Sequence, residues 1–242
     1  MYRIGIDVGS TYTKYCVLDD SEIITLLSEK TPIRQQAFFN EKIKELCMSY
    51  PGAEIISCGY GKANVDGIRN VNELTALAKG VFYCTGKDGA VLDIGGQDTK
   101  IITQEQGRLK SFFVNDKCAA GSGMFLSSVL DMIGIKYEDV DITGIIDIPI
   151  SLSSTCAVFA QSEIVELIAD NRTEKELIAA VMSQILTKAK LLLGKIQCDS
   201  LLISGGLSAI NGIDEYATKV LDVNCMVDEN GKYFSSIGCS LS

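Results

Sequence analysis

The chain has 242 residues, of which 47% are hydrophobic, and a formal net charge of −9. This size and apolar content suffice for one large domain or two smaller ones, and the acidic balance argues against general binding to nucleic acid or to an anionic membrane. No apolar run reaches the roughly 18 residues of a membrane span, and MYRIGIDVGS at the start lacks the pattern of a signal peptide, so we expect a cytoplasmic protein with no nucleic-acid or membrane partner.

An internal repeat begins at the first predicted strand. YRIGI leads into DVGSTYTK at residues 7–14 and then YCVL, while GAVL leads into DIGGQDTK at residues 93–100 and then IIT. Both copies read Asp, a β-branched residue, Gly, three variable positions, Thr and Lys. The pattern predicts strand, tight glycine turn, strand. Two widely separated copies indicate a duplicated α/β unit, because a solenoid repeats at a shorter period.

Each glycine turn is suited to phosphate. Glycines such as Gly9 and Gly95 let the backbone approach a ligand, and converging N–H groups bind phosphate oxygens. We expect the backbone of residues 10–14 to hold phosphates and Asp7 and Asp93 to bracket Mg²⁺, which prefers oxygen ligands. One such hairpin alone favours an ordinary β-hairpin with an exposed acid, so the two matched copies are what favour nucleotide binding.

Two cysteines further along the chain have similar flanking sequences. NDKCAAGSGMF places Cys118 before an apolar run at residues 115–125, and SLSSTCAVFAQSE places Cys156 before another at residues 151–163. Both runs have near-helical spacing, so both cysteines are predicted near helix N-termini, where the dipole favours a thiolate. The alternative is two buried structural cysteines.

The remaining cysteines are interpreted as structural. The chain has nine cysteines and no histidine, which excludes Cys/His zinc sites and histidine-based triads. Disulfides are rare in the cytosol, and there is no Cys-x-x-Cys. Free cysteine packs as a small hydrophobe, and on this ground we assign to the core Cys16, Cys47, Cys58, Cys84 and Cys198. Cys225 and Cys239 are left open.

A long helix and a further strand are predicted in the C-terminal part of the chain. TEKELIAAVMSQILTKAKLLLG at residues 173–194 predicts a long amphipathic helix that opens with a capping box formed by Thr173 and Glu176. LLISGGLS at residues 201–208 predicts a strand ending in a close-approach turn at Gly205 and Gly206, which suits a nucleoside. A Walker A motif is absent.

These motifs resemble a known family. DVGSTYTK, DIGGQDTK and SGGLS, in this order, look like the two phosphate loops and the adenosine loop of the superfamily of actin, heat-shock ATPases and sugar kinases. NDKCAAGSGMF and SSTCAVFAQSE narrow the resemblance to the activators, or component A, of 2-hydroxyacyl-CoA dehydratases. The resemblance runs from residue 2 to about residue 215.

The resemblance implies a fold and a function. The fold is α/β, with two ribonuclease H-like (actin-like ATPase) domains of mixed sheets flanked by helices, at residues 1–88 and 89–242, and the nucleotide in the interdomain cleft. A return of the last segment to the first domain is left open. The function is an ATPase coupled to one-electron transfer from ferredoxin or flavodoxin to a dehydratase. Its cofactors are ATP, Mg²⁺ and one 4Fe–4S cluster per homodimer.

The resemblance also assigns roles to residues. The catalytic residues implied are Asp7, Asp93, Gln97 and Glu163, although Glu163 is equally compatible with a solvated helix-face acid. The nucleotide-binding residues implied are Gly9, Ser10, Thr11, Tyr12, Thr13, Lys14, Gly95, Gly96, Gln97, Gly205 and Gly206. The cluster ligands implied are Cys118 and Cys156.

Two departures from the family stand out. In NELTALAKG, Leu77 occupies the position of a family histidine. The final segment, YFSSIGCSLS, stops about where the family's last helix is expected to begin and pack back on the first domain. Other functions on the same fold are a small-molecule kinase, for which we find no acceptor loop, and a non-catalytic nucleotide sensor.

Overall fold

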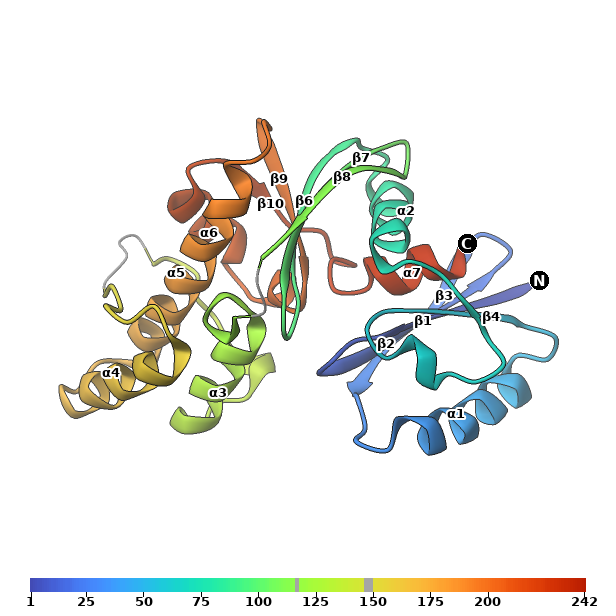
Figure 1. Cartoon of the computed structure of the whole chain (residues 1–242), viewed down its shortest axis with the longest axis horizontal. Helices are drawn as coiled ribbons and strands as arrows, with labels where there is room; N and C mark the ends of the chain where they lie inside the picture. The colour runs from blue at the N-terminus through green and yellow to red at the C-terminus, as the bar shows by residue number, and fades with distance from the viewer. Residues whose placement is uncertain (116–117, 146–149) are drawn as a thin grey trace. The chain divides into compact units, whose positions relative to one another are not determined.

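The computed structural model describes residues 1–115, 118–145 and 150–242, which form two five-stranded sheets with flanking helices (Figure 1). The strand orders are β3-β2-β1-β4-β5 and β10-β9-β6-β7-β8. By contacts the chain divides into unit 1, made of Met1–Asp88, Thr103–Ser111 and Lys232–Ser242, and unit 2, made of Gly89–Ile102 and Phe112–Gly231. None of the helices in the described ranges is both long and apolar enough to cross a membrane.

The sheet of unit 1 is mixed. Its strands are β1 (Tyr2–Val8), β2 (Tyr12–Asp19), β3 (Glu22–Lys30), β4 (Glu54–Cys58) and β5 (Arg69–Asn70). β1 runs antiparallel to β2 and parallel to β4. Side chains alternate between the two faces of a strand, so Ile4, Ile6 and Val8 share one face. There they pack against Phe39 and Leu46 of α1 (Gln35–Ser49).

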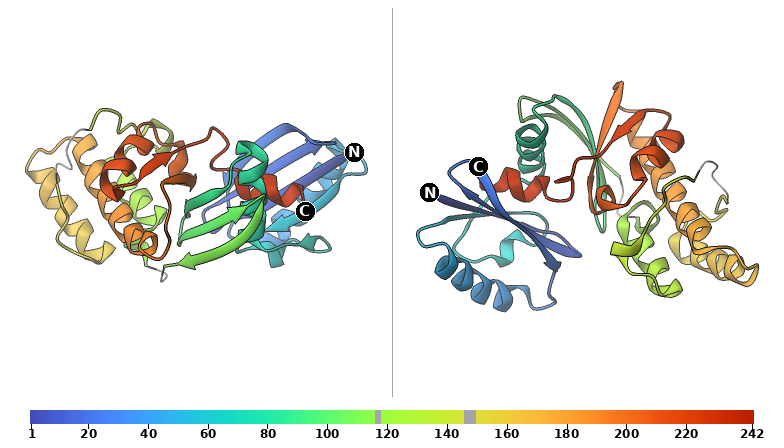
Figure 2. Two further views of the ribbon diagram at one scale, coloured as in Figure 1. Left: turned by 90° about the horizontal axis from the view of Figure 1, so that it is seen from above. Right: turned by 180° about the vertical axis from the view of Figure 1, so that it is seen from behind.

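The opposite face of this sheet is covered by α7 (Phe234–Ser240), which also packs against α2 (Glu73–Thr85) (Figure 2). The contact is close because glycines form it. A Cβ on Gly238 would lie 1.7 Å from the Ala76 carbonyl oxygen, and one on Gly5 would lie 2.0 Å from that of Ser236. The segment expected to stop where a final helix begins is therefore itself that helix. Leu77 is buried in α2.

Unit 2 is built around β6 (Gly89–Ile94), β9 (Ser200–Gly205) and β10 (Asn224–Met226), which are parallel neighbours. β7 (Thr99–Glu105) and β8 (Arg108–Val114) complete the sheet; their connected ends, Thr103–Ser111, count with unit 1. Its α-helices are α3 (Gly123–Ile133), α4 (Ala157–Ala169), α5 (Glu174–Leu193) and α6 (Ile213–Leu221). Its short 3₁₀ helices are η2 (Ala119–Gly121), η3 (Tyr137–Asp139) and η4 (Gly206–Ala209), and a further one, η1 (Lys62–Asn64), lies in unit 1. The predicted capping box of α5 is confirmed: Thr173 and Glu176 bond each other's backbone N–H.

The two sheets confirm the predicted duplication. β1, β2, β3, β4 and β5 take the same places in the first sheet as β6, β7, β8, β9 and β10 in the second. DVGSTYTK spans the end of β1, a turn and the start of β2, and DIGGQDTK does the same for β6 and β7. The predicted α/β fold with two mixed, helix-flanked sheets is therefore correct.

Candidate functional site

The first hairpin turn lies in unit 1 and joins β1 to β2. Asp7 is buried near the end of β1, and the Lys14 Nζ atom lies 3.5 Å from Asp7 Oδ2. Thr31 fastens the turn, because its Oγ1 donates to the Gly9 carbonyl at 2.8 Å and its N–H donates to the Thr11 carbonyl at 2.9 Å. The turn therefore presents a buried acid beside a lysine, with its backbone held in place.

The backbone of this hairpin is only partly available to a ligand. Tyr12, Thr13 and Lys14 belong to β2, which pairs with both β1 and β3. Ladder bonds therefore occupy much of their backbone, and Ser10 and Thr11 form the part of the expected phosphate segment that lies outside the strands.

The second hairpin turn, in unit 2, repeats this arrangement with one addition. Asp93 is buried at the end of β6, and the Lys100 Nζ atom lies 3.6 Å from Asp93 Oδ2 and 3.3 Å from Asp98 Oδ1. Gly95 N–H donates to the Asp98 carbonyl at 2.9 Å and closes the turn. Gln97 is exposed at the tip, where its side chain is accessible to a ligand.

The predicted adenosine loop adjoins this second turn. Asp93 on β6 is paired with Ser204 on β9, so the next residue, Gly205, lies beside Ile94. Gly205 has φ +84°, and a Cβ there would lie 2.3 Å from the Ile94 carbonyl oxygen. Only glycine fits this position. The structure thus brings Asp93, Gly95 and the Gly205–Gly206 turn to one end of the sheet of unit 2.

A counterpart of this glycine turn in unit 1 was missed in the sequence. Asp7 is paired with Cys58 at the end of β4, and Gly59 follows with φ +90°. A Cβ on Gly59 would lie 2.6 Å from Asp7 Oδ1. The available signal was an apolar strand ending in CGYG, which has the strand-then-glycine form of ISGG at the end of β9.

Cys118 and Cys156 stand at the start of helical segments, as predicted. Cys118 immediately precedes η2, which leads into α3, and Cys156 is the N-cap residue of α4. Both are free thiols; Cys156 is exposed and Cys118 is partly buried. Within the described ranges, no group of three or more Cys, Asp or Glu side chains gathers as a metal site. The two thiols at helix starts, Cys118 and Cys156, would supply half of the thiolate set of a 4Fe–4S cluster.

The other cysteines are mostly core residues. Cys16, Cys58, Cys225 and Cys239 are buried, whereas Cys84 and Cys198 are partly buried. Burial raises the pKa of the Cys16 thiol to about 11. The core assignment of Cys47 was wrong, because this side chain is exposed on α1. The helix has a weakly defined apolar face, so the neighbouring Leu46 is buried while Cys47 is not.

Glu163 on α4 binds the segment that precedes Cys156. Its Oε2 accepts the Ser153 N–H and its Oε1 accepts the Ser154 N–H, both at 2.7 Å. Hydrogen bonds from Ser154 and Ser153 lower the pKa of this carboxyl. Gln184 on α5 donates to the Ser154 carbonyl at 3.0 Å. The acid therefore holds the cysteine segment, a role that the sequence did not reveal.

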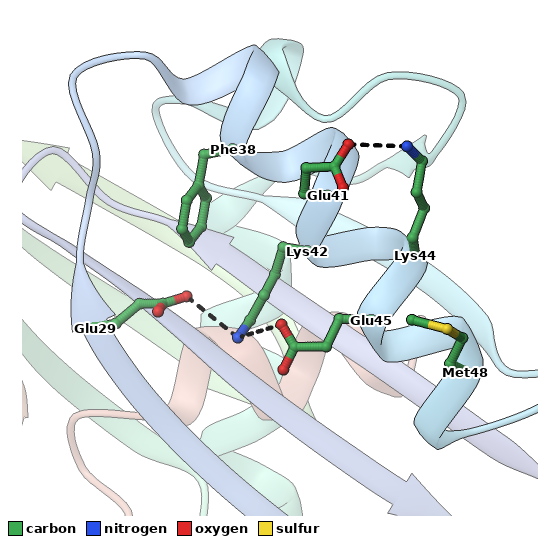
Figure 3. A pocket seen from close by; sticks show the side chains of 7 residues that line it. All are labelled: Glu29, Phe38, Glu41, Lys42, Lys44, Glu45 and Met48. Atoms are coloured by element: carbon green, nitrogen blue, oxygen red, sulfur yellow. Dashed lines mark hydrogen bonds and ion pairs between the residues drawn. The ribbon is translucent and has the colours of Figure 1, made fainter.

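A hollow between β3 and α1 in unit 1 contains none of the candidate residues (Figure 3). It is lined by Glu29, Phe38, Glu41, Lys42, Lys44, Glu45 and Met48. The Lys42 Nζ atom lies 3.3 Å from Glu45 Oε2, and the Lys44 Nζ atom lies 2.9 Å from Glu41 Oε1. Because its lysines pair with its own acids, we assign it no ligand.

Comparisons with known proteins agree with this geometry. The model of the BadF/BadG/BcrA/BcrD ATPase family matches residues 4–238. The activator of lactoyl-CoA dehydratase from Anaerotignum propionicum is 31% identical, over 100% of this chain and 96% of that protein. An uncharacterised protein of Methanocaldococcus jannaschii is also 31% identical, over 98% and 99% of the two chains. The structure of the activator of the 2-hydroxyisocaproyl-CoA dehydratase from Clostridium difficile with bound ADPNP is 26% identical, with a TM-score of 0.88 over 100% of this chain and 93% of that one.

Proposed function

The chain belongs to the BadF/BadG/BcrA/BcrD ATPase family, and from this membership we propose that it is the ATP-dependent activator of a 2-hydroxyacyl-CoA dehydratase-type enzyme. Three relatives are named as activators of such dehydratases, and each aligns with 100% of this chain. The observation that carries the proposal is the pair of incompletely buried thiols, Cys118 and Cys156, at helix starts on an ATPase fold.

The nucleotide is proposed to be Mg-ATP. Asp7 and Asp93 would hold the metal through water, because Mg²⁺ retains several waters when carboxylates bind it. The turn at Gly9, Ser10 and Thr11 and the turn at Gly95 and Gly96 would hold phosphates. The Gly205–Gly206 turn would receive the nucleoside, and Gln97 would orient the attacking water.

The thiols of Cys118 and Cys156 are proposed to ligate a 4Fe–4S cluster shared by two copies of the chain. Each chain contributes two thiolates, so the twofold axis of a homodimer completes the set. When bound, the cluster would supply one-electron redox chemistry. Glu163 and Gln184 fix the backbone before Cys156, and so would hold that ligand in place.

In the proposed reaction, one electron passes from reduced ferredoxin or flavodoxin to the dehydratase component, and ATP is hydrolysed to ADP and phosphate. The setting is the cytoplasm, where the thiols remain reduced. Hydrolysis supplies the free energy for a low-potential transfer, and domain motions of the kind that accompany nucleotide binding couple the two events.

The test is purification without oxygen, followed by iron and sulfide analysis and sedimentation. We expect one 4Fe–4S cluster per two chains, lost in Cys118→Ser and in Cys156→Ser. Cys47→Ser is the matched control, because Cys47 is exposed like Cys156 but lies on α1. A colourless protein that phosphorylates a small acceptor would instead establish the kinase, and a complete cluster in a monomer would contradict the shared site.

A further inference from the structure

The second phosphate turn is directly hydrogen-bonded to the start of α3, the helix that follows Cys118. The N–H of Gly123 donates to the Gly95 carbonyl, and the N–H of Met124 donates to the Gly96 carbonyl, both at 2.9 Å. A helix leaves its first N–H groups without intrahelical partners. Here the carbonyls of the phosphate turn supply those partners, so the turn and the helix start are held together.

Thr99, the first residue after the same turn, reaches the cysteine segment itself. Its buried hydroxyl donates to the Gly121 carbonyl at 2.6 Å. Gly121 in turn donates its N–H to the Cys118 carbonyl at 3.0 Å. Two hydrogen bonds therefore lead from the end of the phosphate turn to the backbone of Cys118.

Asn115 fixes Thr99 from the other side. The Thr99 N–H donates to Asn115 Oδ1, and the Asn115 N–H donates to the Thr99 carbonyl, both at 3.0 Å. A buried group that loses such a bond is left unsatisfied, which is costly. Thr99 therefore links the turn of residues 95–98 both to Asn115 and to the backbone at residues 118–121.

Cys156 is anchored differently. Its segment is held by Glu163 of α4 and Gln184 of α5, and Gln161 of α4 donates to Ser128 Oγ of α3 at 3.0 Å. These anchors include no residue of the phosphate turn. Their one connection toward it is indirect, because Gln161 reaches Ser128 on α3 and only the start of α3 bonds the turn. The two cysteines therefore differ in how they are connected to the nucleotide site.

We propose that nucleotide bound at the turn of residues 95–98 repositions Cys118 and leaves Cys156 in place, with Thr99 and Asn115 as the positioning residues that transmit the change. This inference rests on the proposed function for the nucleotide and for the two thiols. Packed interiors pass small displacements along contiguous hydrogen-bonded contacts. Cys118 is then the ligand that responds to the nucleotide, and Cys156 is the fixed one.

The experiment uses the full chain, purified without iron, and site-resolved alkylation by iodoacetamide measured by mass spectrometry. Rates at Cys118 and Cys156 are compared with and without a saturating non-hydrolysable Mg-ATP analogue, whose binding is checked by calorimetry. We expect the analogue to change the rate at Cys118 by about threefold or more and that at Cys156 by less than about 1.5-fold, within the range typical of coupled sites.

Thr99→Val removes the hydroxyl at nearly constant volume and should reduce the effect at Cys118 to less than about 1.5-fold while the analogue still binds. Thr99→Ser keeps the hydroxyl and should keep the effect. Thr103→Val is the matched control, because the Thr103 hydroxyl lies on the same strand but bonds Ser111 Oγ at 2.7 Å. Should Thr99→Val not fold, Asn115→Ala tests the same connection.

The outcomes separate the two proposals. Equal responses of the two cysteines in the parent protein, or a full response in folded Thr99→Val or Asn115→Ala with analogue bound, would overturn the coupling and leave the proposed function standing. Absence of analogue binding, or iron that does not depend on Cys118 and Cys156, would overturn the proposed function and the coupling with it.

Discussion

The two glycine hairpins have the same parts and different connections. Each has a buried Asp, a Lys that contacts it and a fully buried Thr. In unit 1, the Thr13 hydroxyl lies 2.9 Å from that of Thr31, so it closes the hairpin on the end of its own sheet. In unit 2, the Thr99 hydroxyl bonds Gly121 in the Cys118 segment. The duplicated scaffold thus differs in what its equivalent threonine holds.

The buried acids of the two hairpins, Asp7 and Asp93, also differ in their neighbours. Lys14 contacts Asp7, whereas Lys100 contacts both Asp93 and Asp98. The residue paired with the acid is Cys58 in unit 1 and Ser204 in unit 2. The two copies therefore share the buried Asp, the Lys that contacts it and the buried Thr, while the residues around them differ.

The largest effect is expected from alanine at the two equivalent glycines. Gly205→Ala places a Cβ 2.3 Å from the Ile94 carbonyl oxygen, and Gly59→Ala places one 2.6 Å from Asp7 Oδ1, both at positive φ. Backbone strain and steric overlap together should lower the unfolding free energy by about 3–5 kcal/mol, of unit 2 in Gly205→Ala and of unit 1 in Gly59→Ala. Hydrogen exchange read by mass spectrometry resolves the two units separately.

Gly67→Ala serves as the control for this pair, because Gly67 has φ +70° but no atom lies within 4 Å of the place that its Cβ would occupy. It should cost only the backbone strain, about 1 kcal/mol. A stability loss in Gly205→Ala no larger than that in Gly67→Ala would show that the turn after β9 tolerates a side chain. It would contradict the view that the turns at Gly205 and Gly59 are equivalent.

The second comparison is Asp7→Asn with Asp93→Asn. Loss of a preorganised charge at the metal should lower ATP hydrolysis by about 100-fold or more in either variant. Stability should separate them. Lys14 loses its carboxylate contact in Asp7→Asn, at a cost of about 1–3 kcal/mol, while Lys100 keeps Asp98 at 3.3 Å in Asp93→Asn. Hydrolysis at the parent rate in Asp7→Asn would refute its assignment to the metal.

The sequence predicted those parts of the site that depend on local pattern. A glycine turn between two apolar strands is a local event, so the hairpins at Asp7 and Asp93 and the capping box at Thr173 could be placed from residues alone. The helix starts after Cys118 and Cys156 followed from apolar spacing in the same way.

The parts that escaped prediction depend on tertiary neighbours. Glu163 has the spacing of a solvated helix acid, and only the fold brings Ser153 and Ser154 to it. α7 contains Ser235, Ser236 and Gly238 in place of an apolar stripe, so periodicity gave no signal for a helix that is buried by close backbone approach. Gly59 escaped because its place beside Asp7 follows from the pairing of β4 with β1, which the local pattern CGYG does not reveal.

The third comparison concerns how the stability of each unit depends on pH through its buried thiols. Burial raises the pKa of Cys16 in unit 1 and of Cys225 in unit 2 to about 11 each, and in unit 1 the neighbouring Cys239, followed by burial, raises the pKa of Cys58 as well. Unfolded thiols ionise near pH 8.5, so above that pH the unfolded state binds fewer protons and stability falls.

Each buried thiol should lower the unfolding free energy by about 1.4 kcal/mol per pH unit between about pH 9 and the folded pKa. Burial also raises the pKa of Cys198 in unit 2, so each unit has two such thiols and the stability of both should fall. Cys16→Ala should reduce the slope of unit 1 by one thiol and leave that of unit 2 unchanged. Hydrogen exchange at pH 8, 9 and 10, corrected for intrinsic rates, measures this. A slope of unit 1 that Cys16→Ala leaves unchanged would contradict the raised pKa of that thiol.

The smallest expected stability losses come from removing the equivalent threonine hydroxyls, and they distinguish the two hairpins most directly. Thr13→Val removes one hydroxyl, but Thr31 still donates to the Gly9 carbonyl at 2.8 Å, so unit 1 should lose about 1 kcal/mol or less. Thr99→Val leaves the Gly121 carbonyl without the Thr99 hydroxyl, and unit 2 should lose about 1–2 kcal/mol. Thermal melts and hydrogen exchange of the two variants measure the difference. Because both changes are the same chemistry at equivalent positions, a loss in Thr13→Val that matched or exceeded that in Thr99→Val would mean that the connection to Gly121 contributes nothing beyond an ordinary hairpin bond.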